Sequence, residues 1–166
     1  MSIYKVILLL HVASAFIFIM AHGVSAMVML LMPQQRDRNR ICFLLEITGK
    51  AIGPAMRALD VAILTGLAMT FMAGWQRYAW PWIALTLIFV IGYFMGKFGS
   101  AYMGRVRRAM GAERPGKKRN PRTEPLMPAS FDEMVAVLES GRPRVIATIG
   151  LSGLATILVM MVMKPF

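Results

Sequence analysis

The chain has 166 residues, of which 57% are hydrophobic and 16% are charged, and its formal net charge is +11. A soluble domain of ordinary composition carries about 25% charged residues, so this composition favours an integral membrane protein. The 19 basic residues are concentrated in two segments, which argues against the spread basic surface of a nucleic-acid-binding protein. The single cysteine, Cys42, excludes an internal disulfide and a cysteine metal cluster.

The first apolar segment spans residues 3–32, ends at Pro33, and holds both histidines of the chain, His11 and His22. It exceeds the roughly 20 residues that cross a bilayer, so we expect a tilted and retained helix, not a cleaved signal peptide. The two histidines are eleven residues apart. At about 100° per residue, both rings point the same way, separated by roughly 16 Å along the axis. Steps of four and three residues predict that this side is the interior seam of a bundle, formed by His11, Ala15, Phe18, His22, Ser25 and Met29.

The next apolar stretch, residues 41–75, is too long for one straight span. We expect Gly53-Pro54 to divide it, because proline cannot continue a helix without loss of a hydrogen bond. This predicts an amphipathic interfacial helix at residues 41–52, in which Glu46 and Lys50 pair. A second transmembrane span would then occupy residues 54–74.

The third span is predicted at residues 81–103, after a turn rich in aromatic side chains of the kind that gather at lipid headgroups. A polar connection follows this span. Its residues 111–125 are rich in charge, glycine and proline, which predicts a mobile basic loop.

Ser130 and Glu133 have the spacing of a capping box, which predicts a short helix at residues 130–138. The fourth span is predicted at residues 145–163. Small residues allow membrane helices to approach closely. Two stripes of glycine are expected to allow such close approach. They are Gly92, Gly96 and Gly99 in the third span, and Gly150 and Gly153 in the fourth.

The placement of lysine and arginine predicts the orientation in the membrane. The first connection holds four basic residues and the third holds ten, whereas the opposite side has three, Lys5, Arg77 and Lys164. We therefore expect a multi-pass protein of the bacterial cytoplasmic membrane with both termini outside. The basic connections would contact anionic lipid headgroups. A homo-oligomer and a larger membrane complex both remain open, and no nucleic-acid partner is expected.

Polar, titratable side chains inside a membrane span are costly and usually serve a function. Two histidines along one helix are a familiar way to hold b-type heme. His11 would lie near the outer surface of the membrane, and His22 would lie nearer its middle or inner half. The chain has no other histidine, so a second axial ligand would be a methionine, a group from a second protomer, or absent. Copper is a further alternative, because thioethers such as those of the 16 methionines select Cu(I). In the cofactor-free alternative, each ring hydrogen-bonds to a neighbouring helix.

Arg57 and Asp60 lie one to two turns inside the second predicted span. Their spacing of three residues predicts an ion pair, which lowers the cost of keeping both charges in the membrane. Arg57 would neutralise a heme propionate or another anion. Asp60 and His22 together would form a proton path in a transporter. The simpler interpretation is a structural ion pair between helices.

The opening LLLHVASAFIFIMAHGVSA resembles the first helix of a bacterial family of predicted four-helix membrane proteins of unknown function. That family is related at fold level to the copper-resistance-D-like proteins and the HemJ-type protoporphyrinogen oxidases. Arg57 followed by ILTGLAMTFMAGW resembles their second helix, which also closes in a Thr-Gly pair, here Thr65-Gly66, and the ending KPF adds to the match. The resemblance implies that His11 is an axial ligand of a b-type heme. The second histidine and the catalytic lysine of the HemJ type have no identified match, so protoporphyrinogen oxidation is not implied.

The sequence therefore predicts an all-α membrane protein, an up-down bundle of four transmembrane helices with short interfacial helices in a single domain. The leading functional hypothesis is a small redox protein that binds b-type heme or another metal through His11 and His22. Arg57 and Asp60 would supply the charge partner. The alternatives are a cofactor-free accessory or assembly subunit of a larger complex and a proton-coupled transporter.

Overall fold

The computed structural model describes residues 2–112 and 127–164. These residues form helices and turns without any strand, and four helical segments are long and apolar enough to cross a membrane. The predicted four-helix membrane bundle is therefore confirmed for the described residues. Most of the basic loop predicted at residues 111–125 lies outside them.

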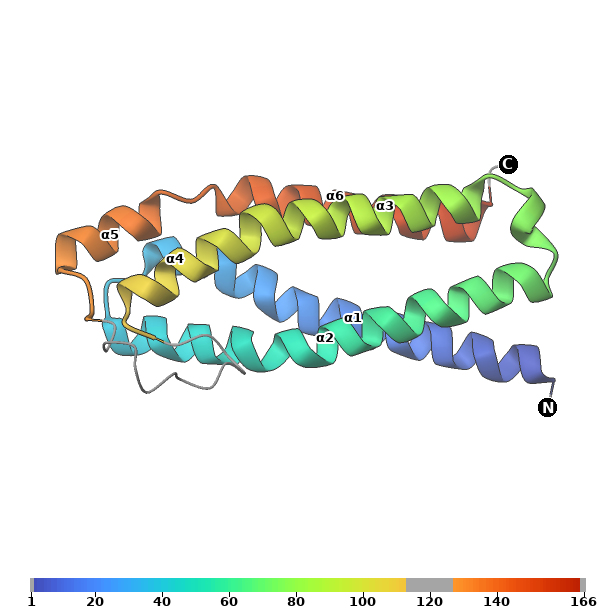
Figure 1. Cartoon of the computed structure of the whole chain (residues 1–166), viewed down its shortest axis with the longest axis horizontal. Helices are drawn as coiled ribbons and strands as arrows, with labels where there is room; N and C mark the ends of the chain where they lie inside the picture. The colour runs from blue at the N-terminus through green and yellow to red at the C-terminus, as the bar shows by residue number, and fades with distance from the viewer. Residues whose placement is uncertain (1, 113–126, 165–166) are drawn as a thin grey trace, which may run out of the picture.

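The first two long helices form an antiparallel hairpin (Figure 1). Helix α1 (Ile3–Leu31) runs into a 3-10 turn, η1 (Met32–Gln34), at the predicted stop, Pro33. Helix α2 (Arg38–Met72) begins at Asp37, whose side chain accepts a hydrogen bond of 2.9 Å from the backbone N–H of Asn39. This N-cap satisfies one of the free donors at the start of the helix.

Helix α2 corrects the prediction of a break at Gly53-Pro54. Residues 41–52 are not a separate interfacial helix, because α2 continues for 35 residues with Pro54 inside it. The buried side of the helix is continuous across the proline, from Leu45 and Thr48 to Ala55 and Ala58. Packing along this side outweighs the loss of one backbone hydrogen bond, and α2 bends near its middle (Figure 1). The predicted pair of Glu46 and Lys50 is present, with 2.7 Å between carboxylate and ammonium.

The third long helix consists of three consecutive parts. Helix α3 (Trp80–Phe94) leads into a π-helical segment, η3 (Met95–Ser100), and then into α4 (Ala101–Ala109). It therefore continues past residue 103, where the predicted span ends. A 3-10 turn, η2 (Trp75–Arg77), connects it to α2.

Helix α5 (Phe131–Glu139) begins with the predicted capping box. The Ser130 hydroxyl accepts a hydrogen bond from the N–H of Glu133 (3.3 Å), and the Glu133 carboxylate accepts one from the N–H of Ser130 (3.1 Å). Helix α6 (Pro143–Met163) is the fourth membrane helix. It ends at the same end of the bundle at which α1 begins (Figure 1), as an up-down topology requires.

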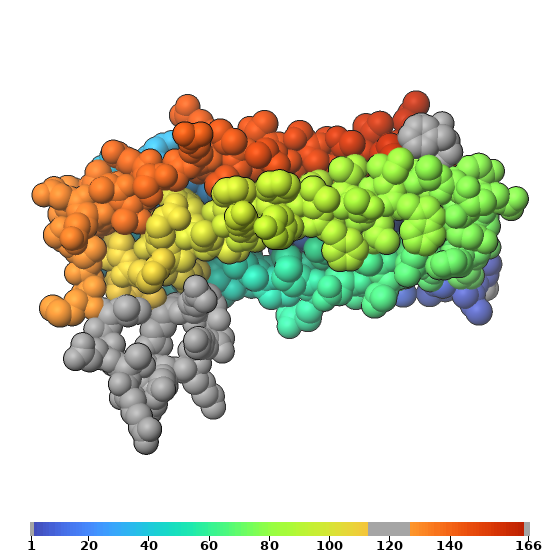
Figure 2. All heavy atoms as spheres, turned by 45° about the horizontal axis from the view of Figure 1, so that its top comes forward, coloured from blue at the N-terminus to red at the C-terminus, as the bar shows by residue number. Residues whose placement is uncertain are grey.

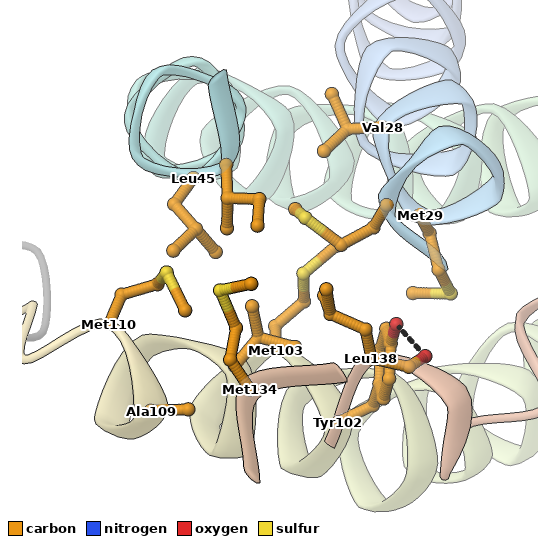
Figure 3. Close-up of a cluster of buried hydrophobic side chains, with 12 residues drawn as sticks. Val28, Met29, Leu45, Tyr102, Met103, Ala109, Met110, Met134 and Leu138 are labelled. Atoms are coloured by element: carbon orange, nitrogen blue, oxygen red, sulfur yellow. Dashed lines mark hydrogen bonds between the residues drawn. The ribbon is translucent and has the colours of Figure 1, made fainter. Parts of the chain in front are cut away.

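A cluster of buried apolar residues lies at the opposite end of the bundle, where α4 and α5 meet the ends of α1 and α2. We call this part the cap and define it by its twelve buried residues. Figure 3 shows their side chains directed toward a common centre. Five of the twelve are methionines, whose flexible thioethers fill irregular space. The residues are Val28, Met29, Met32, Ile41, Leu45, Tyr102, Met103, Val106, Ala109, Met110, Met134 and Leu138.

Two hydrogen bonds between side chain and backbone connect the helices of the cap. The Tyr102 hydroxyl donates to the carbonyl of Leu138 in α5 at 2.9 Å. The Arg107 guanidinium donates to the carbonyl of Leu45 in α2 at 2.7 Å. Both donors are buried, so each bond satisfies a polar group that would otherwise be costly in this core.

Beyond the cap, the long helices expose large apolar side chains along most of their length. Phe16 on α1, Leu64 on α2, Phe89 on α3 and Leu158 on α6 are among them. Figure 2 shows one such flank, where α3 and α6 lie side by side. An apolar surface of this kind is suited to contact with lipid. The helices also satisfy their backbone hydrogen bonds internally, as the bilayer core requires.

The glycines divide into those that contact another helix and those that face open space. A Cβ atom on Gly153 would lie 2.3 Å from Cδ1 of Ile91, and one on Gly99 would lie 3.3 Å from Cε of Met29. Gly92 and Gly96 have no such neighbour within 4 Å. The predicted stripe of Gly92, Gly96 and Gly99 is therefore not one contact face. The π-helical segment explains the difference, since it takes more residues per turn and shifts Gly99 to another side.

Candidate functional site

His11 lies at the interface of α1 and α2 with its ring against α2. Its Nδ1 atom is 2.9 Å from the carbonyl oxygen of Ala62 and 3.2 Å from Oγ1 of Thr65. A carbonyl oxygen can only accept a hydrogen bond, so Nδ1 carries the proton in this arrangement. The Nε2 atom then keeps its lone pair and can bind a metal.

The Thr65-Gly66 pair forms the surface against which the His11 ring lies. The Thr65 hydroxyl donates to the carbonyl of Val61 in its own helix at 2.6 Å, which leaves its oxygen as an acceptor toward His11. A Cβ atom on Gly66 would lie 3.0 Å from Cε1 and 3.4 Å from Nδ1 of His11. Glycine therefore permits the close approach of the ring. Thr65-Gly66 contributes to the family resemblance described above. The same pair contacts His11.

His22 lies on the same side of α1 but contacts different helices. Its ring is stacked on that of Phe18, with 5.4 Å between the centroids and 21° between the planes. No hydrogen bond joins the His22 ring to another residue in the described part of the chain. Its Nε2 atom lies 3.7 Å from the position that a Cβ atom added to Gly150 would occupy. The Sδ atom of Met95 lies 3.3 Å from that position. Elements α1, η3 and α6 thus meet at His22.

The prediction that the histidines face the interior of the bundle is confirmed. None of the six predicted seam residues is exposed, and Met29 is buried. However, the two rings have separate surroundings, since His11 is held by α2 and His22 lies against η3 and α6. Each histidine is therefore a candidate site by itself.

Arg57 and Asp60 do not contribute to either histidine. Both side chains are exposed, while Ala55 and Ala58 occupy the inward side of this part of α2. The predicted ion pair is absent, because a spacing of three residues brings two side chains near each other without fixing where a long guanidinium extends. The ion pairs found among the described residues are Arg36–Glu139, Arg40–Asp37 and Lys50–Glu46.

The described residues contain no group of three or more His, Cys, Asp or Glu side chains that could hold a metal ion. Cys42 is exposed in the cap and lines a surface hollow of about 300 Å³ between α2 and α4, together with Glu46, Lys50 and Arg107. A second hollow, of about 330 Å³, lies on the outer side of α1. Neither hollow is lined by a histidine.

Sequence reasoning did not identify the neighbours of the two histidines. For His11, the Thr-Gly pair was a usable signal, since it stood out in the family resemblance. For His22, Met95 is one of the 16 methionines, and nothing in its spacing distinguishes it from the others. Comparison of the chain with family models, curated proteins and solved structures finds no match.

Proposed function

We propose that this chain is a small membrane redox protein that binds a b-type heme through Nε2 of His11. The observation that carries the proposal is the 2.9 Å hydrogen bond from Nδ1 to the carbonyl of Ala62. Histidines that bind metals commonly donate their other ring N–H to a carbonyl or carboxylate, which fixes the tautomer and the ring orientation. The resemblance of the first helix to that of the HemJ-type proteins supports the same residue.

The residues around His11 fit the role of an axial ligand. Ala62 and Thr65 hold the ring, and the hydrogen bond at Nδ1 makes Nε2 a stronger donor to a metal. A bound heme would supply one-electron transfer through its iron. The second axial position would be open or filled by a methionine or a second protomer. His22 is the second candidate ligand, and Arg57 and Asp60 are not part of the proposed site.

The test is the visible spectrum of detergent-purified protein, oxidised and reduced, with heme supplied during expression. We expect a Soret band with α and β bands on reduction in the wild type, and their loss in His11→Ala. The matched control is Met20→Leu, because Met20 lies on the same helix and its side chain is exposed. A featureless wild-type spectrum from correctly inserted protein would overturn the proposal. Loss of the bands only in His22→Ala would transfer the heme to His22.

A cofactor-free accessory subunit is the second candidate function. The observation that favours it is the open space over Gly92 and Gly96, since membrane helices associate through small residues of this kind. We expect Gly96→Leu to prevent co-purification of a partner subunit from native membranes without altering the fold of this chain. Equal recovery of partner proteins with wild type and Gly96→Leu would remove this candidate.

We also infer that the chain lies in the bacterial cytoplasmic membrane with the cap in the cytoplasm and both termini outside. The excess of basic residues at the cap end supports this orientation, and these residues would contact anionic lipid headgroups. Cys42 offers a direct test because it is the only cysteine and is exposed in the cap. A membrane-impermeant maleimide should label it in inside-out vesicles and leave it unlabelled in intact spheroplasts. Labelling in intact spheroplasts would reverse the orientation.

A further inference from the structure

His22 and Met95 each place a metal-binding atom near Gly150 inside the bundle. Nε2 of His22 and Sδ of Met95 lie 3.7 Å and 3.3 Å from the place that a side chain on Gly150 would occupy. Gly150 is buried and both side chains are half-buried. The absence of a side chain at Gly150 leaves room for the imidazole and the thioether beside the backbone of α6.

The imidazole of His22 has no hydrogen-bond partner among the described residues, although it lies in a membrane-spanning helix. An unpaired polar group in an apolar environment is destabilising. Phe18 covers one face of the ring but offers no polar atom to its nitrogens. The ring therefore has an unused donor atom, and the nearest soft partner identified for it is the Met95 thioether.

Met95 is placed by an irregularity in its own helix. It is the first residue of the π-helical segment Met95–Ser100, which interrupts the regular turn between α3 and α4. Short π-helical segments inside α-helices are frequent at functional sites. Here the segment begins at the residue that turns inward, while its neighbour Gly96 faces open space.

The pair of donors selects a class of metal ion. An imidazole nitrogen and a thioether sulfur are both neutral, and the thioether is a soft ligand that favours Cu(I). The described residues hold no group of three or more His, Cys, Asp or Glu side chains of the kind that harder divalent ions favour. A bare ion needs little space beside the backbone of α6 at Gly150.

We propose that Nε2 of His22 and Sδ of Met95 form a two-donor site for a soft monovalent metal ion, Cu(I), inside the membrane bundle. This inference does not rest on a heme at His11, because the two histidines contact different helices. The three rotatable bonds of the methionine side chain allow its sulfur to close on the ion without movement of the helices.

The test is a competition for Cu(I) between the purified, reduced full chain in detergent and a chromogenic Cu(I) chelator, under anaerobic conditions and without heme. We expect the wild type to bind one ion, and Met95→Leu and His22→Phe to lose this binding. Gly150→Ala should weaken it roughly 10-fold, the lower end of the range for changes beside metal ligands. Its added Cβ would lie 3.3 Å from the sulfur.

Met20→Leu is the matched control, since Met20 is 71% exposed on α1 and has no place in the proposed site. Exchange of methionine and leucine is usually well tolerated in packed interiors, so Met95→Leu should keep the fold. X-ray absorption at the copper edge should show a sulfur neighbour in the wild type and in Met20→Leu, which both bind the ion. Equal Cu(I) affinity in Met95→Leu and Met20→Leu, or no binding by the wild type, would overturn the proposal.

Discussion

Replacement of Gly141 by alanine should destabilise the cap, because the added methyl group would occupy the space of the Tyr102 ring. A Cβ atom on Gly141 would lie 2.4 Å from Cε2 and 2.5 Å from Cδ2 of Tyr102. The ring cannot move aside easily, since it is 1% exposed and its hydroxyl donates to Leu138 at 2.9 Å. Overpacking of this kind costs about 1–3 kcal/mol. Loss of the hydrogen bond adds about 0.5–1.5 kcal/mol.

The effect should be local to α5, which Tyr102 connects to α4. We expect faster hydrogen exchange of the amides in residues 131–139, because the added methyl group lowers the free energy of opening the cap. The matched control is Gly104→Ala, in which the added Cβ has no neighbour within 4 Å. The double variant Tyr102→Leu/Gly141→Ala should cost less than the sum of the two single changes. Equal exchange in Gly141→Ala and Gly104→Ala would refute the reasoning.

Three further changes test other parts of the structure. Gly66→Ala should displace the ring of His11, because the added Cβ would lie 3.0 Å from Cε1. Heme affinity measured by titration should then fall roughly 10–100-fold, and an unchanged affinity would contradict the assigned contact. Pro54→Ala restores a backbone N–H inside α2 and should raise the free energy of unfolding by up to about 3 kcal/mol. A lower stability in denaturant unfolding would instead show that packing needs the bend. Ser130→Ala should cost about 1 kcal/mol in the same assay, whereas Ser130→Asp, which keeps an acceptor for the N–H of Glu133, should not.

The features that depend on spacing along one helix were predictable from the sequence. The inward side of α1 follows from the period of the helix, and His11 and His22 both lie on it. The capping box of Ser130 and Glu133 is likewise a matter of a fixed spacing and of residue types that favour it. In these cases the backbone geometry alone determines which side chains meet.

The features that depend on packing between helices were not predictable. Proline at position 54 signals a break locally, but the continuous buried side of α2 keeps the helix intact. The π-helical segment changes the phase of the third helix, so Gly96 and Gly99 could not be assigned to outer and inner sides from an α-helical period. His22, Met95 and Gly150 come near one another from three segments far apart in the chain. No short spacing in the sequence encodes such proximity.

Because the cap lies at one end of the bundle, the thickness of the bilayer should affect how the long helices of this protein are arranged. Helix α2 has 35 residues, or about 52 Å at 1.5 Å per residue, whereas the hydrocarbon layer is only about 30 Å thick. A helix longer than the layer responds to a thinner bilayer by tilting. With the ends of α1, α2 and α4 held together in the cap, tilt would alter the distance between α1 and η3, which carry His22 and Met95. Lipid composition would thereby tune the geometry of a half-buried pair of side chains inside the bundle.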